Sequence, residues 1–281
     1  MTESSPASES IALHFAQLTH IGGRPSNQDA VGSAQQDDLG CFVVSDGAGG
    51  HEGGEVASNI VVKAILDSFL QALSFSARAM RSYVDQAILQ VGSRQADEAA
   101  LDNMSATVAT ILIDQKNRVA LWAHLGDTRI YHFRDGKLQA LTKDHSLVQQ
   151  FIDAGYCKPD EARSHPQRSV LFAAIGAQGD TVPEITETMV ELHEGDAFLM
   201  CSDGFWEWVT EDEMAQTLAD ATSAECWLAD MNRLAGKKGN AAAESRDNYT
   251  ALTIWLGERD NATPDQQEKL TGAGLSTQHA N

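Results

Sequence analysis

The sequence has no apolar run approaching the roughly 20 residues of a membrane span, and it opens with the polar stretch MTESSPASES where a secretory signal needs positive charge and then apolar residues. We therefore expect a cytoplasmic protein without a membrane partner. Cysteines are few: Cys41, Cys157, Cys201 and Cys226 lie far apart and form no CxxC pair. This spacing suggests neither a zinc site nor a disulfide framework, and we expect reduced thiols.

Basic residues are scarce as well. Twenty lysines and arginines stand against 40 aspartates and glutamates, which gives a formal net charge of -20. Such a surface opposes adhesion to nucleic acid or anionic lipid, so we expect no nucleic-acid partner. An acidic surface also simply keeps proteins in solution, and charge becomes informative about function only where particular aspartates cluster.

The chain of 281 residues contains no internal repeat and no linker rich in Pro, Ser or Gly that is long enough to divide it. Its two ends are polar, and residues 1–10 and 258–281 are predicted to be disordered tails. Between them we expect one domain over residues 11–257, which is large enough to bury a substantial core.

Short apolar runs are typical of strands at residues 11–20, 40–45, 106–114, 118–126, 128–133, 137–142, 196–202 and 249–256. Arg134-Asp135-Gly136 is a hairpin-turn sequence, and Gly126-Asp127 is expected to form a second close connection, so this part should be an antiparallel meander. Apolar residues at four-residue spacing predict helices over 52–73 and 77–100. Because strands and helices are segregated, the pattern favours an α+β fold of antiparallel sheets covered by helices over a doubly wound parallel sheet.

Four aspartates stand at the ends of predicted strands. Asp46 and Asp203 each follow a strand within the tripeptide Ser-Asp-Gly, Asp127 occupies a turn between two strands, and Asp247 precedes the last strand. An Asp-Gly pair after a strand is most often a hairpin turn, so each aspartate alone is weak evidence. If all four converge, their repulsion requires divalent cations, and all-oxygen ligands select Mg²⁺ or Mn²⁺ over zinc.

The surroundings of Asp46 argue against a simple hairpin, because a glycine-rich run, GAGGHEGG, and a helix follow it. A nucleotide-binding loop fits this run poorly: the third dinucleotide glycine would fall on Glu52, and the lysine of a phosphate loop on Glu55. Arg24, in a loop after the first strand, offers a guanidinium that suits phosphate oxygens. Metals together with an arginine indicate phosphate chemistry.

Seven motifs occur in the order and spacing of metal-dependent, PP2C-type serine/threonine protein phosphatases (the PPM family, bacterial type): RPSNQD, SDGAGGHEGGE, GDTRIY, LTKDHS, HPQRSVL, CSDGFWEWV and RDNYTAL. The resemblance extends from about residue 15 to 256. It implies a four-layer α-β-β-α sandwich, in which two antiparallel β-sheets are flanked by helices, with a small flap at about residues 145–183. It also implies a dinuclear Mn²⁺ or Mg²⁺ centre at one end of the sandwich.

The resemblance further implies metal ligands. Asp46 would bridge the two ions, the carbonyl of Gly47 would complete one of them, and Asp203 and Asp247 would hold the other. Asp127, with Asp203, matches a site for a third, looser ion in bacterial relatives.

Other positions would support the reaction. Arg24 matches the phosphate-binding arginine, Asp29 a carboxylate that orients metal-bound water, and Asn248 and Arg129 supporting residues. Gln28 stands where some relatives carry glutamate; its amide can hydrogen-bond water but cannot act as a base.

Some relatives place a histidine, as proposed general acid, where this sequence has Ala48. His51 is a possible proton donor nearby, although a loop histidine is more often structural or exposed. In the flap, the side chains of Arg163, His165 and Arg168 could contact phosphoprotein or merely fix the flap itself. Two tryptophans, Trp206 and Trp208, are interpreted as helix-packing residues.

The function implied by the resemblance is hydrolysis of phosphoserine or phosphothreonine in proteins, by a water or hydroxide bridging the two ions, in opposition to a serine/threonine kinase. By analogy, a forkhead-associated-domain protein is a further candidate partner. Two alternatives stay open. A regulatory pseudophosphatase would bind phosphoprotein without turnover, but Asp46, Asp203 and Asp247 are intact. A phosphatase for small metabolites would be favoured by a deep, closed pocket.

Overall fold

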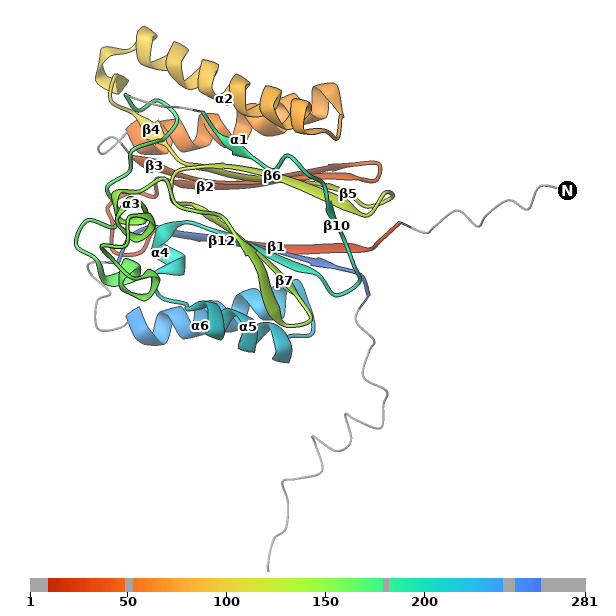
Figure 1. The fold of residues 1–281 in the computed structure, drawn as a ribbon. Helices are drawn as coiled ribbons and strands as arrows, with labels where there is room; N and C mark the ends of the chain where they lie inside the picture. The colour runs from red at the N-terminus through yellow and green to blue at the C-terminus, as the bar shows by residue number, and fades with distance from the viewer. Residues whose placement is uncertain (1–9, 49–52, 179–181, 240–245, 259–281) are drawn as a thin grey trace, which may run out of the picture.

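Two antiparallel sheets lie face to face at the centre of the molecule (Figure 1), in a computed structural model that describes residues 10–48, 53–178, 182–239 and 246–258. The five-stranded sheet has the order β1 (Leu13–His20), β12 (Tyr249–Leu256), β11 (Ala197–Cys201), β7 (Arg129–Arg134) and β8 (Lys137–Leu141). Strands from the two ends of the chain, β1 and β12, are therefore neighbours.

The seven-stranded sheet has the order β10 (Val190–Glu191), β6 (Val119–Leu125), β5 (Val108–Asp114), β3 (Leu39–Ala48) and β2 (Asp29–Gln36), with β4 (Ser105–Ala106) paired to β3 and β9 (Glu184–Ile185) paired to β6. Every pairing in both sheets is antiparallel.

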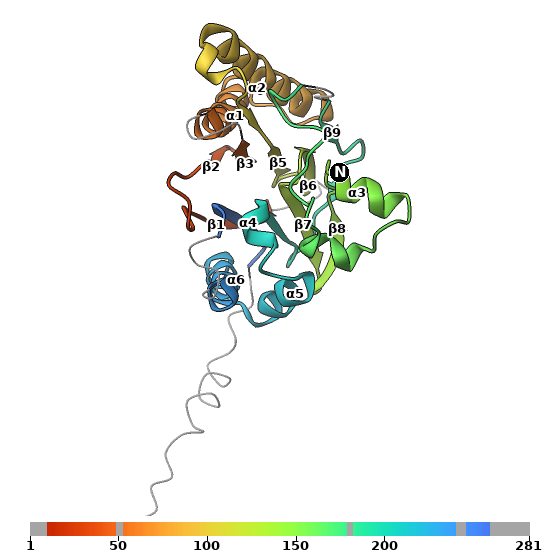
Figure 2. The same cartoon turned by 90° about the vertical axis from the view of Figure 1, so that its left-hand side faces the viewer.

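Helices cover the outer face of each sheet, which completes the four layers (Figures 1 and 2). The seven-stranded sheet is covered by α1 (Gly53–Ala72) and α2 (Ala77–Asp97), and the five-stranded sheet by α5 (Glu211–Asp220) and α6 (Ala224–Gly239). Shorter helices are η1 (Ala99–Leu101), α3 (Leu147–Asp153), η2 (Pro159–Ser164) and α4 (Asp203–Trp206). The predicted α+β sandwich is confirmed.

The central strands are apolar on both faces because each lies between a helix layer and the opposite sheet. In β3, Cys41 and Val43 pack in the cluster beneath α1 and α2, whereas Phe42 and Val44 pack between the sheets, and all four are fully buried. The alternation follows from the two-residue period of a strand. Apolar residues on both faces fix the register of β3, and with it the position of the residues that follow at its end.

One feature of the predicted topology is wrong. Strand β6 belongs to the seven-stranded sheet and β7 to the five-stranded sheet, so the Gly126-Asp127 connection crosses between sheets and does not close a hairpin. A two-residue hairpin of type I′ needs positive φ at both central residues, whereas one of type II′ needs it only at the first. Asp135 and Gly136 meet that requirement with φ values of 52° and 69°, and they join β7 to β8. In the crossing pair only Gly126 has positive φ, of 105°, which a type II′ turn would accept, so the two strands are separated by the sheets in which they pair and not by the turn.

The predicted division into one domain over 11–257 and two tails stays a prediction, because residues 1–9 and 259–281 lie outside the described part of the chain. Within the described ranges, no helix combines the length and the apolar character needed to cross a membrane.

Candidate metal centre

The end of β3 and helix α4 lie at the same end of the sandwich, on the left in Figure 1 and facing the viewer in Figure 2. Carboxylates from both sheets meet there. They come from the end of β3, from the Gly126-Asp127 connection between the two sheets (the crossing turn), from the start of α4 and from the residue before β12. All four line one cavity of about 590 Å³: Asp46, Asp127, Asp203 and Asp247. The structure thus brings together the four aspartates that the sequence placed at strand ends.

These carboxylates repel one another strongly. Burial raises the pKa of Asp46 well above its usual range, and the charges of Asp29 and Asp203 raise it further. Burial and the charge of Asp127 do the same to the pKa of Asp203. For Asp127, burial and the nearby charge of Asp144 raise the pKa to about 7. The cluster therefore holds either protons or cations.

Asp29 lies directly opposite Asp46, because β2 and β3 pair these two residues. It is buried; one carboxylate oxygen, Oδ2, accepts a hydrogen bond of 2.7 Å from Ser202, while Oδ1 has no hydrogen-bond partner among the described residues. Burial raises the pKa of Asp29 to about 6. A buried carboxylate oxygen without a donor is suited to accept a hydrogen bond from a bound ligand or water.

The donor set fits hard divalent cations. Every candidate ligand is an oxygen, which suits Mg²⁺ and Mn²⁺ and does not favour softer ions. Cations would also offset the burial of these charges and their mutual repulsion, which together raise the pKa values of Asp46 and Asp203. The site is therefore chemically suited to the ions that the sequence resemblance implies.

Glycines bring the backbone close beside Asp46. A Cβ atom on Gly47 would lie 2.0 Å from the carbonyl oxygen of Gly54, and one on Gly54 would lie 2.8 Å from the carbonyl oxygen of Gly47. Side chains at these positions would push the first turn of α1 away from the end of β3. This contact explains the glycines at positions 47 and 54.

The crossing turn is held from the five-stranded sheet. The indole Nε1 of Trp206 donates a hydrogen bond of 2.9 Å to the carbonyl oxygen of Asp127. Trp206 is nearly fully buried and packs in the core beneath α5 and α6, as predicted, but this second role was missed. The only signal in the sequence was its closeness to Asp203.

From the seven-stranded sheet, Thr107 links the same turn to Asp46. The backbone N–H of Asp46 donates to Oγ1 of Thr107 at 2.9 Å, and the N–H of Thr107 donates to the carbonyl of Asp46 at 2.8 Å. Oγ1 of Thr107 also hydrogen-bonds Oγ1 of Thr128, next to Asp127. Two carboxylates that come from distant parts of the chain are thereby fixed relative to each other.

Arg24 stands at the rim of the cavity, where about half of its side chain is exposed. Its Nη2 donates to Oδ2 of Asp247 at 2.7 Å. The loop that carries Arg24 is held by Asn248, whose amide group donates to the carbonyls of Ile21 and Ser26 and accepts from the N–H of Gln28. Asn248 therefore positions the arginine loop, and Gln28 itself lines the cavity.

Arg129 is not among the residues that line the cavity; it forms a buried pair with Asp144, in which Nε and Nη2 donate to the two carboxylate oxygens at 2.8 and 2.7 Å. Its guanidinium also lies 3.6 Å from the centre of the Trp206 ring. Arg129 thus packs against Trp206, whose indole donates the hydrogen bond to Asp127, in keeping with a supporting role.

The flap borders the cavity through residues other than those predicted. In the described part of the chain, the lining includes Ser169, Leu171 and Phe172 but not the three predicted flap side chains. Arg163 donates to Glu211 at 2.6 Å, Arg168 donates to Glu207, and His165 packs edge-on against Phe151. The two arginine contacts fasten the flap to α5 and to the residue after α4, and the histidine contact lies within the flap. His51 lies outside the described residues.

The protein phosphatase 2C family matches residues 16–244, which is most of the sequence, and the chain belongs to this family. The serine/threonine protein phosphatase PstP of Mycobacterium tuberculosis is 36% identical over 224 residues, which are 76% of this chain and 40% of that protein. The chain thus spans less than half the length of this relative. Protein phosphatase PhpP of Streptococcus pneumoniae is 28% identical over 257 residues, 88% of this chain and 99% of that protein.

Solved structures agree with this membership. The crystal structure of the PstP catalytic domain in complex with two manganese ions superimposes with a TM-score of 0.75 at 25% identity, over 89% of this chain and 100% of that one.

Proposed function

We propose that this protein hydrolyses phosphoserine and phosphothreonine in proteins, with two Mn²⁺ or Mg²⁺ ions in the carboxylate cavity. One observation carries the proposal: four aspartates from both sheets share one cavity with an arginine, in an arrangement that raises the pKa values of three of them. The PstP relative crystallised with two manganese ions supports the choice of metal.

The ions would be held by Asp46, the carbonyl of Gly47, Asp203 and Asp247, with Asp127 and Asp203 at a third, looser position. Asp46 is central because it stands beside both Asp29 and the crossing turn. Bound divalent ions lower the pKa of a nucleophilic water and neutralise charge on phosphoryl oxygens.

The other residues of the site bind the phosphoryl group or orient the groups that act on it. Arg24 binds the phosphoryl oxygens from the cavity rim, and Asn248 keeps its loop in place. Asp29 accepts a hydrogen bond from the attacking water through its unpaired Oδ1. Gln28 hydrogen-bonds in the cavity but moves no proton. His51 is kept as a candidate donor of the proton that the leaving oxygen requires.

The substrate side of the cavity is formed by the flap, where Phe172 is 45% exposed and presents an apolar ring beside the carboxylates. A phosphorylated side chain reaches the ions past this ring, whereas Arg163, His165 and Arg168 fix the flap through Glu211, Phe151 and Glu207. The enzyme opposes a serine/threonine kinase in the cytoplasm, where its four free cysteines stay reduced. A forkhead-associated-domain protein is a further candidate partner.

The test measures release of phosphate from a phosphothreonine peptide by purified protein with Mn²⁺, with Mg²⁺ and with EDTA, beside an Asp46→Asn variant. A phosphorylated sugar serves as the metabolite control. We expect metal-dependent turnover of the peptide that EDTA and the variant abolish. Tight peptide binding without turnover would indicate a pseudophosphatase, and preference for the sugar would indicate a metabolite enzyme.

A further inference from the structure

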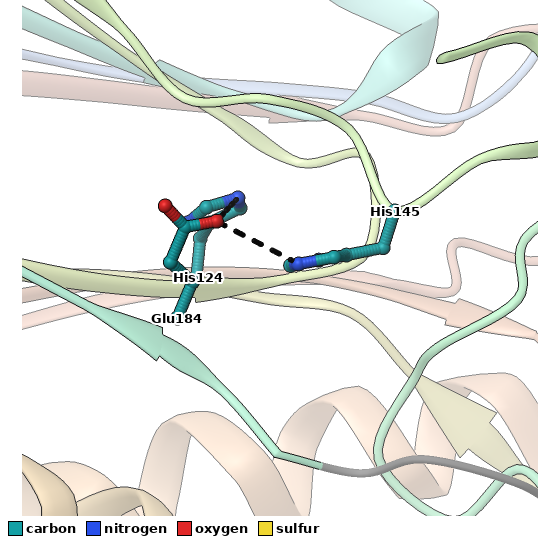
Figure 3. A group of neighbouring side chains, drawn as sticks. All are labelled: His124, His145 and Glu184. Atoms are coloured by element: carbon teal, nitrogen blue, oxygen red, sulfur yellow. Dashed lines mark ion pairs between the residues drawn. The ribbon is translucent and has the colours of Figure 1, made fainter. Parts of the chain in front are cut away.

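Outside the carboxylate cavity, two histidines and a glutamate converge behind the crossing turn (Figure 3). His124 is near the end of β6, His145 lies in the segment between β8 and α3, and Glu184 begins β9. The two imidazole rings stack with their centres 4.8 Å apart, and each Nε2 lies 3.9 Å from Oε2 of Glu184. The histidine side chains are largely buried, at 3% and 17% exposure, and the glutamate is open to solvent.

Hydrogen bonds fix which ring nitrogens carry protons. Nε2 of His124 lies 2.8 Å from the carbonyl oxygen of Lys143, so it must be the protonated donor. Nδ1 of His145 accepts the backbone N–H of Gly126 at 3.0 Å, so in the neutral ring the proton is on Nε2. Both Nε2 atoms therefore carry a proton: that of His124 is donated to the carbonyl of Lys143, and the Glu184 carboxylate lies 3.9 Å from each nitrogen, too far for a hydrogen bond. A metal ion bound by both would have to break both hydrogen bonds, and the arrangement suits a hydrogen-bonded clamp better.

His145 makes two hydrogen bonds to the crossing turn. Besides accepting from Gly126 through its side chain, it donates its own backbone N–H to the carbonyl of Gly126 at 2.9 Å. Gly126 is the residue before Asp127, so this pair of bonds sets the direction in which the turn leaves β6. The ring of His124 stacks on that of His145 and restricts its orientation, and the negative charge of Glu184, 3.9 Å from Nε2, favours a proton on that nitrogen, which leaves Nδ1 free to accept from Gly126.

We propose that His145 is a positioning residue for Asp127, clamped by His124 and Glu184, and that it sets the affinity of the third, looser ion. The proposal rests on the proposed function, because that function assigns Asp127 to the third ion. The expected size follows from metal sites in general, where removing a group that orients a ligand costs about 10- to 100-fold in metal affinity.

The experiment counts Mn²⁺ ions and their affinities by electron paramagnetic resonance titration of the full chain. It compares wild type with His145→Ala, His145→Asn and His145→Gln, and it records thermal unfolding in EDTA for each variant. The Asn amide oxygen replaces Nδ1 and can accept from Gly126, whereas the Gln oxygen is placed near Nε2 and cannot. His193→Ala, at a histidine side chain that is half exposed, is the matched control.

We expect His145→Ala and His145→Gln to weaken only the loosest ion, by about tenfold or more, with His145→Asn restoring its affinity to within about threefold of wild type. Equal weakening of every ion, unchanged affinities, or failure of the Asn rescue would each overturn the inference. Wild type that binds two ions and turns over peptide, but binds no third, would also overturn it while the phosphatase proposal stands. Wild type that binds no ion would refute the proposed function itself.

Discussion

The buried pair of Arg129 and Asp144 gives a stability prediction whose size follows from the structure. Both side chains are only 9% exposed and share two hydrogen bonds, and the guanidinium lies against the ring of Trp206. Arg129→Met keeps much of the aliphatic volume but leaves the carboxylate of Asp144 buried without its partner. Breaking a buried pair from one side costs about 3–5 kcal/mol, and we expect that loss in the free energy of unfolding.

The assay is urea denaturation with EDTA, so that ion binding does not contribute. The matched control is Arg81→Met, which breaks a pair with Asp85 whose side chains are 42% and 46% exposed, and which should cost less than about 1 kcal/mol. The double variant Arg129→Met/Asp144→Leu should recover most of the loss, because no buried charge is left unpaired. A single variant as stable as the Arg81 control, or a double variant no better than the single, would refute the reasoning.

Three further predictions concern the cavity. Burial raises the pKa of Asp29 to about 6 and that of Asp127 to about 7. Protonation of these two groups therefore stabilises the folded protein fully below the pKa of an unfolded carboxylate, and this stabilisation is lost as the pH rises to the folded values, so the melting temperature in EDTA should fall between about pH 4 and 7. Mn²⁺ should then raise it more at pH 8 than at pH 5.5, and equal shifts would contradict this linkage. Arg24→Ala should lower kcat/KM for a phosphopeptide by on the order of 100-fold, because the arginine binds the phosphoryl oxygens. Calorimetry should show that the affinity for Mn²⁺ is retained. An equal loss in Mn²⁺ affinity would count against a phosphate-binding role. Gly47→Ala should lower the melting temperature, because the added Cβ would lie 2.0 Å from a carbonyl oxygen. Gly92→Ala is the control and should not lower it, because a Cβ there meets nothing within 4 Å. Similar effects of the two substitutions would argue against the close approach at Gly47.

Elements with a strong apolar pattern could be predicted from the sequence. Strand β12 is buried along its whole length, and its run YTALTIWL gave its bounds directly. Strand β2 was missed because DAVGSAQQ contains few β-branched or aromatic residues; it is a strand because it pairs along its whole length with β3. The helices α5 and α6 were not predicted either. The assignment of β6 and β7 to different sheets depends on packing that no local turn sequence records.

In the site, too, the features that are local in the sequence could be predicted and those that depend on long-range contacts could not. The aspartates could be proposed because strand ends and motif spacing are local properties of the chain. The groups that aim them could not, since the bond from Trp206 to Asp127 spans 79 residues and the bond from Gly126 to His145 spans 19. Neither tryptophan nor histidine is an unusual residue in its own segment, and only the fold brings each to its partner.

The most direct test of the metal centre is a crystal grown with Mn²⁺ and measured at the manganese absorption edge. Our account predicts anomalous difference peaks in the cavity within bonding distance of Asp46, Asp203 and Asp247, and their loss in an Asp46→Asn crystal. Peaks confined to other acidic groups, or a cavity without any peak at saturating Mn²⁺, would contradict it.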